Sequence, residues 1–266
     1  MKIIIIIITI TITITITLAA VSVLVSNLAW AEDTKPDNDI SVNLSVVTDY
    51  RYRGISQTRL QPALQGGADY TNNPSGFYAG TWLSTIKWIK DISGGGNSAI
   101  EWDLYVGRRG ALTEGISYDV GGLYYKYPNN GLGGVGGFGN ADTIEIYGQL
   151  GVGPVYIKYA QSTTNLFGNP GSKSSGYLDV GTNLELGNNF VLNLHAGYQK
   201  VKGPNSSVGS YSDYKIGVTR EFKNWAGITM SIAAIGTNAD RSFYASPANG
   251  KNLGKNSVVF SLSKVF

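Results

Sequence analysis

The sequence predicts an all-β fold, an antiparallel up-and-down transmembrane β-barrel of about twelve strands with short periplasmic turns and long extracellular loops. Three observations lead to this prediction. The chain begins with an apolar leader, apolar and polar residues then alternate with period two along most of its length, and the connections between the alternating segments are alternately short and long.

Residues 1–31 have the organisation of a secretory signal peptide, because Lys2 precedes a long apolar stretch that ends at Ala29-Trp30-Ala31. The apolar stretch is long enough to span a bilayer, so an uncleaved membrane helix is the alternative. The small residues around Trp30 and the short acidic segment 32–39 favour cleavage near Ala31. We therefore expect residues 40–266 to form the barrel, exported to the bacterial outer membrane.

The composition narrows the class of protein further. Only 15% of the 266 residues are charged, against roughly 25% in ordinary soluble domains. There is no cysteine, which excludes disulfides and cysteine-bound metals. The net charge is +3 and the basic residues form no run, so no nucleic-acid partner is expected.

Period-two alternation marks the strands, and clusters of Gly, Asn, Pro and Ser separate them. The expected strands are 40–53, 61–71, 77–88, 99–109, 116–127, 142–150, 155–161, 177–186, 189–200, 211–221, 228–237 and 256–266. Short turns such as 151–154 alternate with long loops such as the glycine-rich 128–141. An up-and-down barrel with all its long loops at one end produces this pattern, whereas a Greek-key sandwich does not require it.

Each strand has one apolar face and one polar face. In 99–109, for example, Trp102 and Leu104 oppose Glu101 and Asp103. A soluble barrel would turn the apolar face inward, and a membrane barrel turns it to lipid. An arginine at the lipid midplane costs about 2–4 kcal/mol, so we expect the charged face to line the lumen.

Aromatic residues near strand ends on the apolar face predict the interfacial girdles of a membrane barrel. These are Tyr50, Tyr52, Tyr70, Tyr118, Tyr124, Tyr198, Tyr214 and Phe266. Three charged residues on the same face, Lys126, Arg220 and Lys264, lie near strand ends, where long side chains reach water.

The last segment, 256–266, alternates and stops on an aromatic residue. We expect Phe260, Leu262 and Phe266 to form a membrane-insertion signal, because the C-terminal end of an outer-membrane barrel is read during insertion. The expected partners are therefore the outer-membrane lipid and the barrel assembly machinery, besides small solutes. An ordinary edge strand is the alternative for this segment.

The stretches "VVTDYRYRGISQT", "PALQGGADY" and "YDVGGLYYKYP" resemble the TorF family of proteobacterial porins, a group first catalogued as conserved proteins of unknown function. The resemblance extends over roughly residues 40–266, and its most specific part is Asp-Tyr-x-x-Arg-Gly-Ile-Ser at 49–56. It implies an outer-membrane β-barrel that acts as a diffusion channel. It implies no established substrate and no catalytic residues.

Charged residues on the polar face are the candidates for lining a pore. They are Asp49, Arg51, Arg53, Glu101, Asp103, Asp119, Glu145, Lys158, Asp179, His195 and Lys215. The densest group, Arg51, Arg53 and Arg59 with Asp49, has two interpretations: it biases the passage of anions, or it pairs with lumen acids such as Glu101, Asp103 and Asp119 and braces the strands.

The sequence favours a passive channel for small hydrophilic solutes, without cofactor or metal, over two alternatives. One is a closed structural or adhesive barrel. Barrels of about 8 strands are filled by side chains and barrels of 16–18 strands leave an open channel, so twelve strands give an intermediate bore. Bulky residues such as Tyr125, Tyr147 and Tyr156 can block it. The other is a hydrolase, which the single histidine, His195, disfavours. Residues 131–136 match G-x-G-x-x-G, but strands flank them, so a flexible loop is expected.

Overall fold

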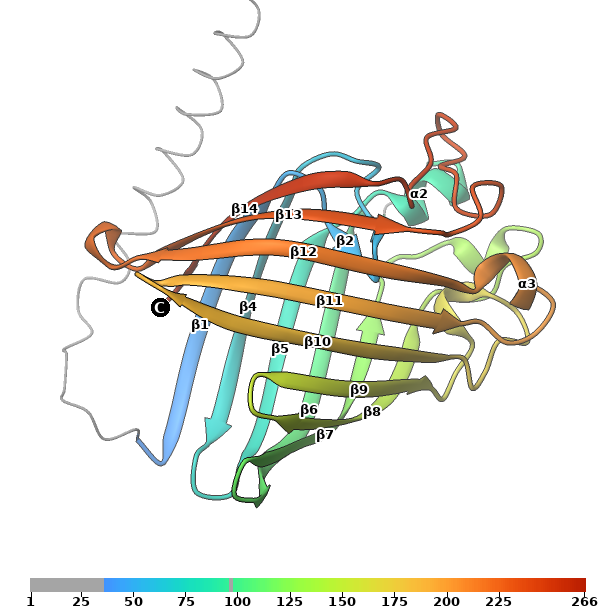
Figure 1. Cartoon of the computed structure of the whole chain (residues 1–266). Helices are drawn as coiled ribbons and strands as arrows, with labels where there is room; N and C mark the ends of the chain where they lie inside the picture. Colours follow the sequence, from blue (N-terminus) through green and yellow to red (C-terminus); the bar gives the residue numbers. More distant parts are fainter. Residues whose placement is uncertain (1–35, 96–97) are drawn as a thin grey trace, which may run out of the picture. The chain divides into compact units, whose positions relative to one another are not determined.

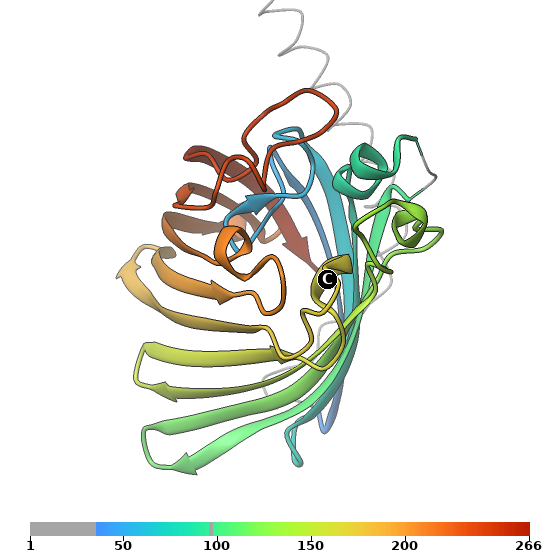
Figure 2. The same ribbon diagram turned by 90° about the vertical axis from the view of Figure 1, so that its right-hand side faces the viewer.

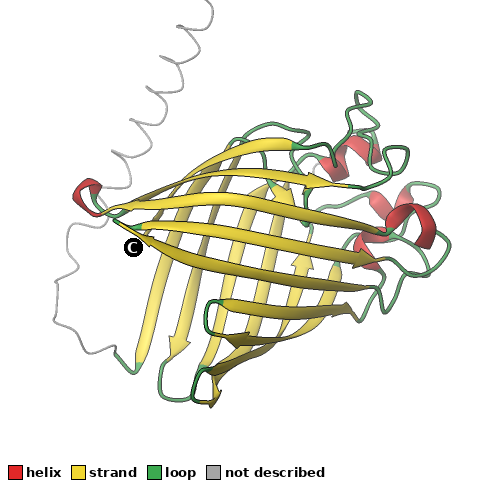
Figure 3. Ribbon diagram, viewed as in Figure 1, coloured by secondary structure: helices red, strands yellow, loops and turns green. Residues whose placement is uncertain are grey.

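The computed structural model describes residues 36–95 and 98–266, so the expected signal peptide lies outside the described residues. Twelve antiparallel strands close into a barrel in the order β1-β14-β13-β12-β11-β10-β9-β8-β7-β6-β5-β4, which confirms the predicted antiparallel barrel of about twelve strands (Figure 1 and Figure 3). None of the described helices is long and apolar enough to cross a membrane.

The barrel strands agree closely with the segments expected from alternation. They are β1 (Asn38–Val47), β4 (Ala63–Asn72), β5 (Phe77–Thr85), β6 (Ile100–Thr113), β7 (Ile116–Lys126), β8 (Thr143–Val152), β9 (Val155–Ser162), β10 (Gly176–Gly187), β11 (Phe190–Lys200), β12 (Tyr211–Phe222), β13 (Ile228–Thr237) and β14 (Ser257–Val265). The first strand closes the ring, because Val46 pairs with Leu64 on β4 and with Leu262 on β14.

The apolar face of the strands is the outer surface of the barrel. Ile146 is 55% exposed and Phe260 is 52% exposed, whereas the carboxyl-bearing Glu101 and Glu145 are buried inside. Successive side chains of a strand point to opposite faces, so this orientation applies along the length of each strand. The outer surface is therefore a belt of exposed Ile, Leu and Val side chains.

The connections differ at the two ends of the barrel (Figure 1). At one end are the short turns, such as 114–115 and 153–154. At the other end are the long connections, which carry the short helices α2 (Trp88–Ser93) and α3 (Ser206–Gly209) and the 3₁₀ turns η1 (Leu132–Gly134) and η2 (Leu166–Gly168). A third 3₁₀ turn, η3 (Lys223–Trp225), lies between β12 and β13.

The prediction of a single strand over 40–53 is wrong beyond Val47. The chain leaves the wall there and forms a two-stranded hairpin, β2 (Arg51–Tyr52) and β3 (Ile55–Ser56). Its turn residues Arg53 and Gly54 have φ of 46° and 78°. Positive φ at both positions of a two-residue turn is typical of tight hairpins, and glycine at the second position adopts it without strain.

Large side chains inside the barrel pack over glycines of the neighbouring strands. Tyr147 on β8 is paired with Gly121 on β7 and lies over it. A Cβ added at Gly121 would lie 2.6 Å from the Tyr147 hydroxyl oxygen and 2.6 Å from the Val106 carbonyl oxygen. The abundant glycine therefore makes room for tyrosine in a narrow lumen.

The long connections form a hydrophobic core of their own. Ile89 of α2 and Leu132 of η1 are fully buried, and they pack in one cluster with Tyr50, Tyr125 and Tyr127. Tyr127 follows the end of β7, and its burial raises the pKa of its hydroxyl. This core covers the long-loop end of the barrel on the side of β4–β8.

Candidate channel lumen

The β2–β3 hairpin lies inside the ring of strands, not in the wall (Figure 2). It belongs to the connection between β1 and β4, but its side chains contact strands and loops on several other sides of the barrel. Tyr52 packs edge-on against Tyr125 of β7 and Phe167 of η2, with ring centroids 5.6 and 5.5 Å apart. Its hydroxyl is 2.6 Å from the Tyr125 hydroxyl. The hairpin therefore narrows the lumen as an inserted segment.

Arg53, at the tip of the hairpin, is held by the opposite wall. Its guanidinium donates to both carboxylate oxygens of Glu145 on β8, at 3.1 and 2.6 Å, and to the side-chain oxygen of Gln199 on β11 at 2.6 Å. It also lies over the Tyr177 ring of β10, 4.2 Å from its centroid. The Arg53 and Glu145 side chains are only 7% and 2% exposed, so this is a buried, bidentate ion pair.

Arg51 fixes the base of the hairpin. It donates to Asp49 Oδ2 at 2.5 Å, to the carbonyl oxygens of Leu253 and Lys255 at 3.0 and 3.1 Å, and to Ser257 Oγ at 2.7 Å. Leu253 and Lys255 belong to the last long loop and Ser257 to β14, whereas Asp49 belongs to the same connection as Arg51. Asp49 in turn accepts hydrogen bonds from Ser56 and Thr58 within the connection.

Arg59 pairs with Asp91 of α2 outside the lumen, and these hydrogen bonds raise the pKa of the Arg59 guanidinium. All three arginines thus have carboxylate partners, but among these pairs only Arg53–Glu145 joins the connection to an acid of a barrel strand, as the bracing interpretation requires. The partners differ from those expected: they are Asp49, Glu145 and Asp91 instead of Glu101, Asp103 and Asp119. The sequence alone could not show these partners, because the connection between β1 and β4 carries the three arginines away from the barrel wall.

Three acids lie buried on the wall facing the hairpin. Glu101 accepts a hydrogen bond from the Tyr50 hydroxyl at 2.7 Å, and Glu145 is held by Arg53. Asp103, between them on the inner face, has a buried Oδ1 that finds no partner among the described residues. Asp119, nearer the short turns, accepts from the Tyr78 hydroxyl at 2.5 Å.

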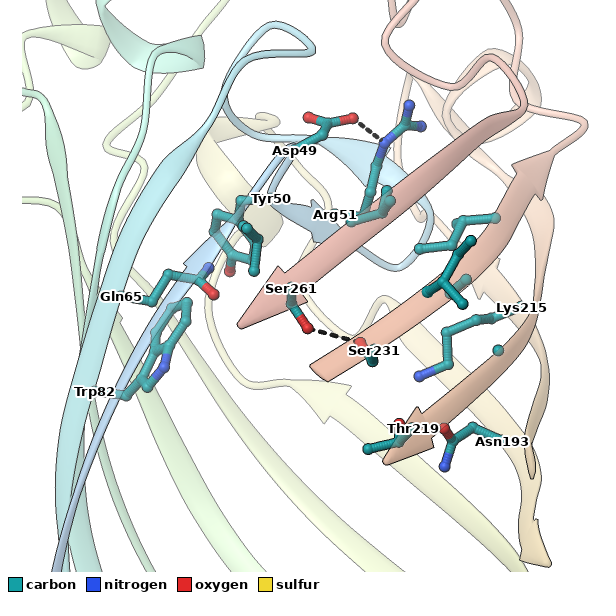
Figure 4. Close-up of a pocket in the computed structure, with 16 residues that line it drawn as sticks. Asp49, Tyr50, Arg51, Gln65, Trp82, Asn193, Lys215, Thr219, Ser231 and Ser261 are labelled. Carbon is teal, nitrogen blue, oxygen red and sulfur yellow. Dashed lines mark hydrogen bonds and ion pairs between the residues drawn. The ribbon is translucent and has the colours of Figure 1, made fainter. Parts of the chain in front are cut away.

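Two cavities formed by the described residues adjoin the hairpin in the lumen. The smaller, of about 260 Å³, lies between the hairpin base and β12–β14 and is lined by Tyr50, Arg51, Trp82 and Lys215 among others (Figure 4). The larger, of about 340 Å³, lies between the hairpin tip and β7–β12. Arg51, Lys215 and Ile235 line both cavities, so the two adjoin.

His195 on β11 stands between two carboxylates of the larger cavity. Its Nδ1 is 2.8 Å from Asp179 Oδ1 and its Nε2 is 2.7 Å from Asp213 Oδ1. The Tyr177 hydroxyl donates to Asp213 Oδ2 at 3.0 Å. Because ionised carboxylates only accept hydrogen bonds, this geometry suits an imidazolium that donates from both nitrogens.

Lys158 and Lys215 also line the larger cavity, from β9 and β12. The Lys158 ammonium lies 3.8 Å from the centroid of the Tyr147 ring. Within the part of the chain that the structure describes, neither lysine forms an ion pair. They differ in this respect from Arg51, Arg53 and His195.

The candidate pore-lining residues are therefore divided between the wall and the inserted hairpin. Glu101, Asp103, Asp119, Glu145, Lys158, Asp179, His195 and Lys215 project inward from barrel strands. Asp49, Arg51 and Arg53 belong to the inserted connection. The sequence reasoning missed Asp213, Tyr177 and Gln199, although Asp213 shares the inward face of its strand with Lys215.

The aromatic girdle prediction is wrong for Tyr50 and Tyr52. Tyr50 is 8% exposed within the core of the long connections, and Tyr52 lies in the lumen, because both follow the point where β1 ends. Tyr198 and Tyr214 are each 44% exposed on the outer surface, close to the long-loop ends of β11 and β12. Phe260 and Leu262 lie on the face of β14 that points to the outside of the barrel, and their role in membrane insertion stays a prediction.

The geometry adds no support for the hydrolase alternative or for a dinucleotide site at residues 131–136. His195 has both nitrogens engaged by carboxylates. Among the described residues, no group of three His, Cys, Asp or Glu side chains is placed to hold a metal ion. Residues 131–136 contain η1 and lie in the loop between β7 and β8, without the strand and helix that a dinucleotide site requires.

A family model described as "Bacterial protein of unknown function (Gcw_chp)" matches residues 31–266. No curated protein matches the chain. Among solved structures, the KdgM porin in complex with disordered oligogalacturonate has a TM-score of 0.50 at 6% identity, covering 85% of this chain and 98% of that chain.

The NanC porin has a TM-score of 0.48 at 10% identity, covering 85% of this chain and 98% of that chain. OprD of Pseudomonas aeruginosa has a TM-score of 0.40 at 9% identity, covering 86% of this chain and 66% of that chain. At these identities the likeness to the KdgM porin concerns the fold alone.

Proposed function

We propose that this chain, which belongs to the Gcw_chp family of bacterial proteins of unknown function, is a porin-like channel of the bacterial outer membrane. It passes small hydrophilic solutes by diffusion between the long-loop end and the short-turn end. Residues 1–31 direct its export and are cleaved near Ala31, and β14 with Phe266 directs its insertion. The resemblance to the TorF porins supports the same function.

The observation that carries this proposal is the opposite polarity of the two barrel surfaces. Exposed apolar side chains such as Ile146 and Phe260 form the outer surface, and ionised side chains with two cavities occupy the interior. Only a closed sheet satisfies its backbone hydrogen bonds in hydrocarbon, and this barrel has no free edge. A water-filled interior within an apolar exterior is the arrangement that conducts solutes.

The inserted hairpin sets the size limit of the channel. Solutes pass beside it, through the adjoining cavities of about 260 and 340 Å³, so the channel admits small molecules and excludes large ones. Planar-bilayer recording of the purified full-length protein tests this directly. We expect discrete, small conductance steps that are absent when detergent alone is added. Complete electrical silence of protein that has folded and inserted would overturn the channel.

A closed barrel with an external binding role is the second candidate, and one observation favours it. Ile89 and Leu132 are fully buried in a core that covers the long-loop end, and the hairpin occupies the lumen below it. Liposome swelling with sugars of increasing size separates the candidates. A channel gives a size-dependent rate, and a closed barrel gives none.

A further inference from the structure

We propose that Lys158 and Lys215 form a binding site for small hydroxylated carboxylates in the larger lumen cavity. The site gives the solute class of the proposed channel and rests on that function for its biological role. Binding itself requires only the folded barrel. The two can therefore be tested separately.

The two lysines stand out from the other cations that line the larger cavity. Arg51, Arg53 and His195 each contact a carboxylate of the protein. Within the described part of the chain, Lys158 and Lys215 have none at ion-pair distance, although both are half-buried. Among the described residues, Asp119, Asp179 and Glu145 attract the Lys158 ammonium without forming an ion pair with it. A partly buried ammonium that lacks a counter-ion in contact is costly, and an anion from solution would offset that cost.

The register shows why two carboxylates near these lysines do not pair with them. A third, Asp119, accepts a hydrogen bond from the Tyr78 hydroxyl. Lys158 lies directly opposite Asp179 across β9 and β10, and Lys215 lies directly opposite His195 across β11 and β12. His195 binds Asp179 through Nδ1 and Asp213 through Nε2. One imidazole therefore holds two acids that would otherwise be available to the lysines.

The surroundings of the lysines fit a small polar ring compound. Tyr147, Tyr156 and Tyr177 line the same cavity, and tyrosine offers both a ring face and a hydroxyl group. Lys158 is positioned over the Tyr147 ring, and no side chain of the described residues pairs with its ammonium as a carboxylate partner. The cavity, at about 340 Å³, lies near the lower end of the range of ligand pockets, roughly 300–1,000 Å³. A carboxylated monosaccharide has the required size, charge and hydroxyl groups.

Isothermal titration of the purified full-length protein in detergent micelles tests the site, with glucuronate as the probe and glucose as its neutral counterpart. We expect glucuronate to bind at least tenfold more tightly than glucose. The double variant Lys158→Gln/Lys215→Gln should lose at least tenfold in glucuronate affinity, and each single variant should lose less. The double variant with arginine at both positions keeps the charges and should keep most of the affinity.

Lys200→Gln is the matched control, because Lys200 is exposed at the end of β11 and lies outside the cavity. Equal affinity for glucose and glucuronate, or undiminished glucuronate binding in the glutamine variants, would sink the proposal. Should the double glutamine variant not fold, as judged by circular dichroism, the single variants decide. Lysine-dependent binding by a barrel that does not conduct would support the binding site and contradict the proposed channel. Conduction without glucuronate binding would support the channel and contradict the binding site.

Discussion

Replacing Arg53 with methionine should release the β2–β3 hairpin from the lumen wall. Methionine keeps much of the length of the side chain but loses the charge and the hydrogen bonds to Glu145 and Gln199. The Glu145 side chain is 2% exposed and, among the described residues, would keep only the hydrogen bond from the Tyr125 hydroxyl, at 3.2 Å. Removing one partner of such a buried pair costs about 3–5 kcal/mol.

This cost falls mainly on hairpin docking, because Arg53 is the tip residue and Glu145 belongs to the wall. Each 1.4 kcal/mol is a factor of ten, so a loss of about 3 kcal/mol raises the undocked population roughly 100-fold. Hydrogen exchange of a peptide spanning residues 49–60, read by mass spectrometry, should show protection reduced by a similar factor. The single-channel conductance should rise in parallel, because the hairpin occupies the lumen.

Two further variants make this test specific. Adding Glu145→Gln to Arg53→Met removes the stranded carboxylate and should restore part of the protection. Lys126→Met is the matched control, since the Lys126–Asp142 pair is more exposed, at 38% and 13%, and pairs of this kind contribute at most about 1 kcal/mol. If Arg53→Met leaves both hairpin exchange and conductance as in the wild type, Arg53 is not the anchor of the hairpin.

Three other predictions concern the wall of the barrel. Gly121→Ala should lower the free energy of unfolding by about 1–3 kcal/mol in urea titrations, because the added Cβ would meet a backbone carbonyl oxygen. Gly148→Ala is the control: the atom nearest to its added Cβ is 3.9 Å away, so its free energy of unfolding should stay near that of the wild type. Ile146→Arg should reduce the free energy of folding into lipid vesicles by about 2–4 kcal/mol, and an unchanged value would refute a lipid-facing position for this side chain. His195→Ala leaves Asp179 and Asp213 without their shared hydrogen-bond donor and should lower the free energy of unfolding. Adding Asp213→Asn should recover part of this loss in the same urea titration. No recovery would argue against repulsion between the two carboxylates as the cause.

The family of the protein limits what the comparisons contribute to these tests. The matched family is described as having unknown function, and the KdgM porin shares 6% of its residues with this chain. The substrate class therefore has to come from the side chains that line the lumen. Lys158 and Lys215 are the most informative of these, because the described structure gives them no carboxylate partner.

The sequence by itself determined the barrel, most of its strand boundaries and the direction of each face of the wall. Ile144 and Ile146 point outward and Glu145 inward because successive side chains of a strand alternate, which is a property of the local backbone. The alternation of turns and loops was readable for the same reason, since Gly, Asn and Pro act within a few residues of their own position. These predictions needed no knowledge of which strand neighbours which.

Only the tertiary structure decided the path of residues 48–62 and the partners of the charges. The alternation of the first strand continues through Arg51 and Arg53 in the sequence, yet these residues bind partners 202 and 92 positions away. Such contacts exist only after the barrel has closed and brought β8 and the last loop to face the hairpin. A local pattern fixes the face of a side chain, but the pairing of a buried charge depends on which distant groups the closed fold places beside it.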